Sequence, residues 1–268
     1  MWMIGRGNEA TPLNWVQTGT NHPETVVLIH AVGYDLTYWD RQIEALRDRY
    51  NVVAFDLPGH GMSPGEPQDW TFGKAAELVA NLIERVDTKP IHLVGISFGG
   101  TIAQATALAR PSLIRSLTLI ATACTFSDEV RKGMRARAQA VRTGGMAAVL
   151  ESSLERWFTP ETRSRRPDII DRVSKTILAD DPGIHAAIWE IISNFDVQDR
   201  LAEIACPALV LVGERDPSTT PAMASVLTSG IRDSRMVVIP DASHMVILEA
   251  PVAVNQALNA FLAQVAIQ

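Results

Sequence analysis

The chain alternates short apolar runs with longer segments of helical spacing, and this alternation restricts its fold more than any other feature. Residues 25–29 and 52–55 are rich in β-branched side chains and too short for helices, so we predict strands buried on both faces. Between them, residues 38–49 place apolar side chains at helical spacing among charged ones, as in a helix that covers a sheet. A strand, a helix and a second strand in this order predict a parallel sheet.

The same alternation continues and is interrupted once. Further helices are predicted at 72–86 and 98–110, and further strands at 91–94 and 117–121. Residues 127–199 are charged and helical in pattern, with no convincing strand, before residues 208–212 restore the strand signal. A last strand at 236–239 and a closing helix at 252–263 follow.

These patterns predict an α/β protein with a mostly parallel, doubly wound sheet and an inserted helical cap. We place the core domain at residues 1–124 and 200–268 and the cap at residues 125–199. In such a sheet, ligands bind at the carboxyl ends of the strands.

Composition narrows the class of partner. The 268 residues are 47% hydrophobic and 20% charged, which excludes wholesale disorder. The net charge of −6 comes without a long basic run, so nucleic acid and anionic membranes have no electrostatic support as partners. A small-molecule substrate is expected, and a homo-oligomer stays open.

The sequence also suggests a location and predicts no bound metal. Residues 1–7 lack a secretory signal pattern and no long apolar run follows, so we expect a cytoplasmic protein. Cys124 and Cys206 stand far apart, outside any metal-binding spacing, so neither a disulfide framework nor a zinc site is expected. We expect no metal and no cofactor.

Ser97 is the predicted nucleophile. It occupies the centre of the G-x-S-x-G pattern at residues 95–99, which follows a predicted strand and opens a predicted helix. A sharp turn there strains the serine backbone and lifts its hydroxyl clear of the chain. The alternative is a glycine-rich turn with an idle serine.

A serine hydroxyl needs a base, and His244 is the favoured candidate. It follows the last predicted strand and so belongs to the loops at the strand ends. His60 also follows a strand, but we expect its loop to support the structure rather than to supply the base. Asp216 comes directly after strand 208–212 and is the favoured acid to orient the histidine, with Glu214 as second choice.

Two backbone N–H groups are expected to stabilise the oxyanion of a tetrahedral intermediate. One is that of Phe98, next to the nucleophile. The other is that of Val32, in the loop His30-Ala31-Val32-Gly33 after the first strand of the parallel sheet.

The chain resembles the α/β-hydrolase superfamily over essentially its full length. The resemblance is carried by residues 30–33, 56–63, 95–99, 213–216 and the His244 loop. Within the superfamily it is most similar to the 3-oxoadipate enol-lactonase and carboxylesterase group, through residues 30–36, 39–40 and 156–160. One departure is Ala31, where many relatives have glycine.

The resemblance implies cofactor-free hydrolysis of a small ester or lactone, including an enol-lactone, through an acyl-enzyme intermediate, with a triad of Ser97, Asp216 and His244. Two alternatives stay open: a carbon–carbon bond hydrolase of ring-cleavage products, and a non-catalytic ligand-binding member of the fold. The carbon–carbon hydrolases usually have tryptophan after the histidine, whereas Met245 follows here.

The substrate pocket is expected to involve four side chains: His30, Trp39, Trp157 and Trp189. The two cap tryptophans equally suit packing of the cap onto the core. The early cap is rich in arginine, at positions 131, 135, 137, 142 and 156. Any of these could bind an anionic substrate or simply lie on a solvated helix face.

Overall fold

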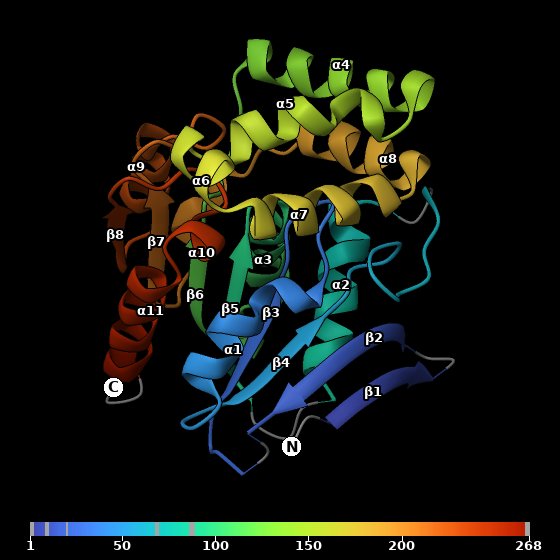
Figure 1. The fold of residues 1–268 in the computed structure, drawn as a ribbon. Helices are drawn as coiled ribbons and strands as arrows, with labels where there is room; N and C mark the ends of the chain where they lie inside the picture. Colours follow the sequence, from blue (N-terminus) through green and yellow to red (C-terminus); the bar gives the residue numbers. More distant parts are fainter. Residues whose placement is uncertain (1–2, 9–10, 20, 68–69, 86–88, 266–268) are drawn as a thin grey trace.

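A twisted sheet forms the centre of the molecule (Figure 1). The computed structural model describes residues 3–8, 11–19, 21–67, 70–85 and 89–265. Within them, eight strands lie in the order β1-β2-β4-β3-β5-β6-β7-β8. The strands are β1 (Met3–Asn8), β2 (Thr11–Thr18), β3 (Thr25–Ile29), β4 (Asn51–Phe55), β5 (Ile91–Ile96), β6 (Ile114–Ile120), β7 (Ala208–Gly213) and β8 (Ser234–Ile239). Neighbours from β4 to β8 pair in parallel, which confirms the predicted doubly wound sheet.

The antiparallel strands β1 and β2 were not predicted. β2 pairs with β1 on one side and β4 on the other. In β2 the buried Leu13 and Val16 are separated by less buried residues such as Asn14, so the strand lacks the continuous apolar run of the central strands. A strand at the margin of a sheet buries fewer positions, and its sequence signal is weaker.

Helices cover both faces of the sheet. One face carries α1 (Asp40–Leu46) and α11 (Pro251–Val265), and the other carries α2 (Phe72–Ile83), α3 (Phe98–Ala109) and α9 (Pro221–Gly230). The helix predicted at 38–49 is divided into a 3₁₀ turn, Leu36–Trp39, followed by α1. The helix predicted at 72–86 ends at Ile83, and position 86 lies outside the described residues. Helix α9 was not predicted.

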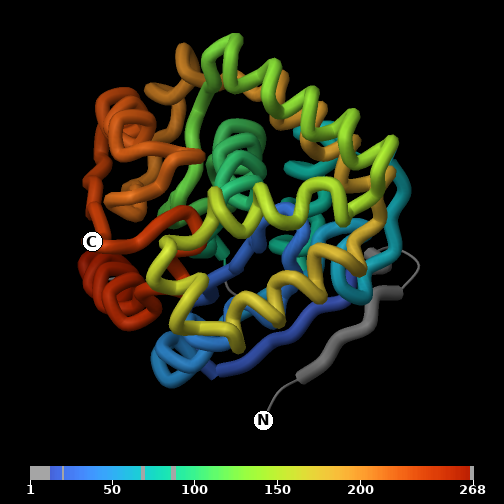
Figure 2. Tube along the Cα trace, turned by 45° about the horizontal axis from the view of Figure 1, so that its top comes forward, coloured from blue at the N-terminus to red at the C-terminus, as the bar shows by residue number. Residues whose placement is uncertain are grey.

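The inserted cap is confirmed as a group of helices between β6 and β7. Its members are α4 (Asp128–Gly144), α5 (Ala147–Trp157), α6 (Pro160–Arg165), α7 (Pro167–Ala179) and α8 (Pro182–Ser193). They lie over the carboxyl ends of the parallel strands (Figure 1), and the tipped view shows them arching across that end of the sheet (Figure 2). A short four-residue helix, α10 (Val246–Glu249), precedes α11.

The described helices include none with the length and apolar character needed to cross a bilayer.

Candidate active site

Ser97 occupies the turn between β5 and α3. Its φ of 52° and ψ of −116° lie outside the regions that side-chain-bearing residues ordinarily adopt. The turn is held by the Ser97 N–H, which donates to Ile120 O at 2.8 Å, and by Thr122 Oγ1, which donates to Ser97 O at 2.9 Å. The surrounding sheet therefore maintains a strained backbone that presents the hydroxyl above the strand end.

The flanking glycines allow this turn by their lack of a side chain. A Cβ on Gly95 would overlap the carbonyl oxygen of Gly99, and a Cβ on Gly99 would overlap that of Ile29. Helix α3 consequently approaches β5 and the end of β3 more closely than any larger residue permits.

His244 lies in the loop after β8 and reaches the serine. Its Nε2 is 2.9 Å from Ser97 Oγ, and its Nδ1 is 2.8 Å from Asp216 Oδ2. Both side chains are buried, with 4% of His244 and 3% of Asp216 exposed. His60 is also buried, but its Nδ1 contacts the carbonyl oxygen of Pro58 within its own loop.

Asp216 is held by groups that follow it in the chain. Oδ1 accepts from the N–H groups of Ser218 and Thr219 at 2.8 and 3.0 Å, and Oδ2 accepts from Thr219 Oγ1 at 2.7 Å. Burial raises the pKa of Asp216, but His244 and the two hydrogen bonds from Thr219 together lower it below its ordinary value. Asp216 is therefore a carboxylate that can hold His244 with Nδ1 protonated and Nε2 free to accept.

Sequence reasoning missed Thr219. Part of the signal was present, because an aspartate side chain in a turn typically accepts from the backbone two residues further on, which keeps residues 218 and 219 close to Asp216. Glu214, the second choice for the acid, is exposed, and its carboxylate accepts from the N–H of Asp241 instead.

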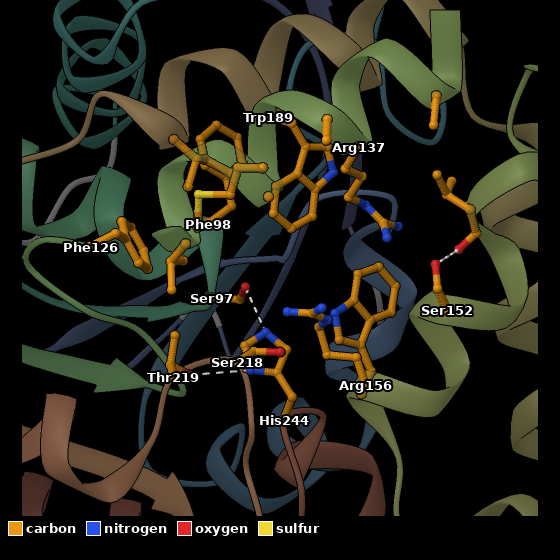
Figure 3. A pocket seen from close by; sticks show the side chains of 18 of the residues that line it. Ser97, Phe98, Phe126, Arg137, Ser152, Arg156, Trp189, Ser218, Thr219 and His244 are labelled. Atoms are coloured by element: carbon orange, nitrogen blue, oxygen red, sulfur yellow. Dashed lines mark hydrogen bonds between the residues drawn. The ribbon is translucent and has the colours of Figure 1, made fainter. Parts of the chain in front are cut away.

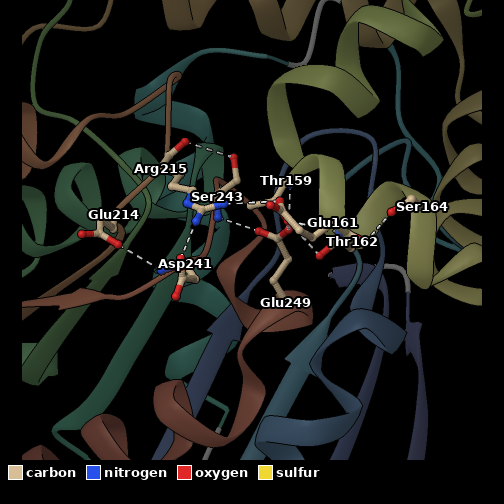
Figure 4. A network of polar contacts seen from close by, with 9 residues as sticks. All are labelled: Thr159, Glu161, Thr162, Ser164, Glu214, Arg215, Asp241, Ser243 and Glu249. Atoms are coloured by element: carbon tan, nitrogen blue, oxygen red, sulfur yellow. Dashed lines mark hydrogen bonds and ion pairs between the residues drawn. The ribbon is translucent and has the colours of Figure 1, made fainter.

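A second polar network ties the histidine loop to the cap (Figure 4). Glu249 Oε2 accepts from the Ser243 N–H at 2.6 Å, while Oε1 accepts from the N–H and Oγ1 of Thr159, both at 2.8 Å. The N–H of Met245 donates to the cap carbonyl of Trp157 at 3.0 Å. The loop bearing the histidine is thus anchored on both sides of His244. Sequence reasoning did not anticipate Glu249.

The two expected oxyanion donors lie on segments that touch. Phe98 is the first residue of α3, so its N–H has no acceptor within the helix. A Cβ on Gly99 would come within 2.6 Å of His30 O, which places the loop carrying Val32 against the start of α3. Val32 and Phe98 themselves are buried.

A cavity of about 540 Å³ lies between this arrangement and the cap. Ser97 and His244 line its floor, and α4, α5 and α8 contribute most of its remaining wall (Figure 3). The predicted pocket residues Trp157 and Trp189 are part of that wall. The cavity is large enough for a small organic substrate.

His30 and Trp39 are not among the residues that line the cavity. Trp39 is fully buried in the core beside α1. His30 is buried beneath the loop it begins: its Nδ1 lies 2.8 Å from Ala31 O and its Nε2 accepts from the Leu57 N–H at 2.9 Å. Their place in the structure is therefore packing and loop support, which the sequence pattern could not separate from substrate contact.

The described part of the chain holds no group of three or more histidine, cysteine, aspartate or glutamate side chains placed to bind a metal ion. Cys124 and Cys206 are free thiols, and burial raises the pKa of each to about 11.

Known proteins resemble the chain in both sequence and fold. It is 28% identical over 250 residues to 3-oxoadipate enol-lactonase 2 of Acinetobacter baylyi, covering 93% of this chain and 92% of the relative. The enol-lactonase of Burkholderia xenovorans superposes with a TM-score of 0.88 at 28% identity, covering 97% of this chain and all of that one. A thermophilic esterase of Thermogutta terrifontis, solved with malate bound, superposes with a TM-score of 0.86 at 30% identity over 99% of both chains.

The predicted resemblance to the enol-lactonase and esterase group is thereby confirmed. The sequence profile described as the alpha/beta hydrolase family matches residues 26–257. Since that match spans most of the chain, the protein belongs to the alpha/beta hydrolase family.

Proposed function

We propose that the protein is a serine hydrolase that cleaves a carboxylic ester or lactone of a small molecule through an acyl-enzyme intermediate. The observation that carries the proposal is the hydrogen-bonded chain from Ser97 through His244 to Asp216, of which Ser97 and His244 line the cavity beneath the cap. The enol-lactonase and esterase relatives support the same class of substrate.

In acylation, Ser97 Oγ forms a bond to the substrate carbonyl carbon and its proton passes to His244 Nε2. The carbonyl electron pair moves to oxygen, and the N–H groups of Val32 and Phe98 stabilise this oxyanion. The oxyanion collapses, the bond to the leaving oxygen breaks, and His244 returns its proton to that oxygen. Asp216 keeps the imidazole oriented and stabilises its transient positive charge.

In deacylation, water takes the place of the serine. Its oxygen attacks the ester carbon of the acyl-enzyme while His244 Nε2 accepts a proton. The second oxyanion collapses, Ser97 Oγ departs with the proton from His244, and the free acid leaves. Each step uses only Ser97, His244 and Asp216, the two backbone N–H groups and one water molecule.

The test is the Ser97→Ala variant with an activated short-chain ester. We expect kcat to fall by about 10⁶-fold, since removal of the nucleophile alone abolishes the concerted action of the three residues. A fluorophosphonate probe should label the native protein once per chain at Ser97.

The matched control is Ser164→Ala, which removes an exposed serine hydroxyl that donates to Glu161 O. This variant should keep both turnover and labelling. Native turnover in Ser97→Ala would contradict the proposal. So would a Ser97 that reacts no faster than Ser164, which is the result expected of a ligand-binding protein without catalysis.

A further inference from the structure

Two of the cap arginines reach the cavity. Arg137 from α4 and Arg156 from α5 both line it, and Figure 3 shows them on the cap side of the cavity. The other early cap arginines are engaged elsewhere or turned away. Arg131 pairs with Asp196, Arg142 pairs with Glu190, and Arg135 is exposed outside the cavity lining.

Arg137 is a partly buried cation with few polar partners. Its guanidinium lies 4.9 Å from the ring centroid of Trp189 and 5.7 Å from that of Trp157. Among the described residues its one hydrogen bond runs from Nη2 to Ser153 Oγ, and Nε is buried without an acceptor. No carboxylate of the described residues forms an ion pair with it.

The charge of Arg137 persists in this setting. Burial, together with the nearby positive charge of Arg156, lowers the pKa of Arg137 to about 10. At neutral pH the group is still a cation. The carboxylate that lines the same cavity is Glu129, eight residues earlier on α4, which places it about 12 Å away along the helix axis.

A buried charge is ordinarily paired, because removing it from water is costly unless an opposite charge compensates. A guanidinium also has a planar fork of donors that matches a carboxylate in two parallel hydrogen bonds. Arg137 lacks such a partner among the residues that the structure describes, and it lines the cavity, so it is suited to bind a carboxylate supplied by the ligand.

The protein also fixes the surface on which Arg137 lies. The indole N–H of Trp189 donates to His185 Nε2 at 2.9 Å, and His185 Nδ1 lies 2.7 Å from Asp180 Oδ2. Since an indole nitrogen only donates, Nε2 must be unprotonated and Nδ1 must carry the proton. Asp180 and His185 thus orient Trp189, and Trp189 orients Arg137.

We propose that the preferred substrates carry a free carboxylate besides the bond that is cleaved, and that Arg137, assisted by Arg156, binds this carboxylate. The proposal rests on the hydrolase function above and specifies its substrate class. Arg137 binds and orients the substrate, while Asp180, His185 and Trp189 act as positioning residues.

The first experiment compares matched substrates that differ only in charge. The acyl-side pair is the mono-p-nitrophenyl ester of adipic acid and the same ester with the free acid replaced by a primary amide. The alcohol-side pair is 4-acetoxybenzoate and 4-acetoxybenzamide. Rates are corrected for spontaneous hydrolysis, and the quantity compared is the ratio of kcat/KM for acid over amide within each pair.

We expect the native protein to favour the acid about 10- to 100-fold in at least one pair, the range for a hydrogen bond to a charged group. Arg137→Gln should bring that ratio close to one, mainly through KM. Arg137→Lys, which keeps the charge and loses the fork, should give an intermediate ratio. Arg135→Gln, an exposed change on the same helix, should leave the ratio at its native value.

The second experiment separates binding from catalysis. Adipate and adipamide are titrated into Ser97→Ala, and into Ser97→Ala combined with Arg137→Gln, by following tryptophan fluorescence. Adipate should bind at least tenfold more tightly than adipamide in the first protein and lose this advantage in the second, whose fold is checked by circular dichroism.

Each outcome bears on one proposal or the other. Turnover that depends on Ser97, with an acid-to-amide ratio that Arg137→Gln does not change, overturns the carboxylate site and leaves the hydrolase function standing. A native preference for the amide in both pairs also overturns it. If no ester is cleaved but adipate binding depends on Arg137, the proposed reaction is wrong while the carboxylate site is supported.

Discussion

At the scale of single residues, the hydrogen-bond partners of two histidines determine which ring nitrogen carries the proton. The Nδ1 of His244 faces a carboxylate, so it carries the proton and leaves Nε2 as the acceptor for Ser97. The same reasoning assigns Nδ1 protonation to His185, whose Nε2 accepts from Trp189. In the proposed reaction, Asp216 and His244 prepare Ser97 as the nucleophile, whereas Asp180 and His185 hold Trp189 in the wall of the cavity.

We predict that Asp216→Asn lowers kcat by about 10⁴-fold, since an amide can donate to Nδ1 and so favours the tautomer whose Nε2 cannot accept. The control is Glu214→Gln, which alters the neighbouring acid whose carboxylate accepts from Asp241 N–H. That variant should keep kcat within a few-fold of the native value, as measured by steady-state turnover of an activated ester. The reverse pattern would assign the acid role to Glu214.

At the scale of elements, the site depends on how closely α3 approaches β3 and β5. Gly99 meets the carbonyl of Ile29, and Gly95 meets that of Gly99. The crossing places the N-terminus of α3, with its free N–H groups and positive dipole end, beside Ser97. Both the close packing of α3 on the sheet and the turn at Ser97 therefore require the two glycines.

We predict that Gly99→Ala lowers the free energy of unfolding by about 3 kcal/mol, because the new methyl group overlaps backbone atoms that cannot move independently. Gly133→Ala is the matched control: it lies in α4 with open space around its Cβ position. This second change should raise stability by about 0.5–1 kcal/mol. Urea unfolding measures both, and equal effects would refute the close-approach argument.

At the scale of the whole molecule, side chains of the cap and of the core pack in the same buried hydrophobic clusters. Ile184 and Ile188 of α8 pack in the same buried cluster as β3 and α3, and Val149 of α5 packs in the cluster on the other face. Glu249 adds polar anchors from Ser243 to Thr159. The molecule also buries several neutral histidines, which makes its stability sensitive to acid.

Two of these histidines define the sensitive range of pH. Burial lowers the pKa of His30 and of His92 from 6.5 to about 4, with Arg115 also lowering that of His92. Between these values the unfolded chain binds protons that the native protein does not, so stability falls as pH falls from 6.5 toward 4. Each histidine contributes about 3 kcal/mol to this loss.

We predict that His92→Gln reduces the loss of stability between pH 7.5 and 4.5, because the variant lacks one histidine that takes up a proton on unfolding. His92 lies in β5 and does not line the cavity. Urea unfolding at the two pH values measures the difference, which cancels any change in stability common to both. A variant with the native pH dependence would show that His92 does not resist protonation in the folded state.

The sequence by itself determined the central parallel strands, the helices between them except α9, the interruption by a cap and the turn at Ser97. These features depend on local chemistry: β-branched runs, helical spacing, and glycines around one serine. The sequence also predicted Asp216 as the acid and His244 as the base, because parallel strands bring their carboxyl ends to one edge of the sheet. The antiparallel strands β1 and β2 were not predicted, since the sequence signal of β2 is weak.

Only the tertiary structure decided which side chains share the site. Trp39 and Trp157 are both aromatic, yet one lies in the core and the other lines the cavity. Arg137 and Arg142 are five residues apart on α4, yet Arg142 pairs with Glu190 and Arg137 lines the cavity. Burial and pairing depend on residues distant in sequence, so they are properties of the packed molecule.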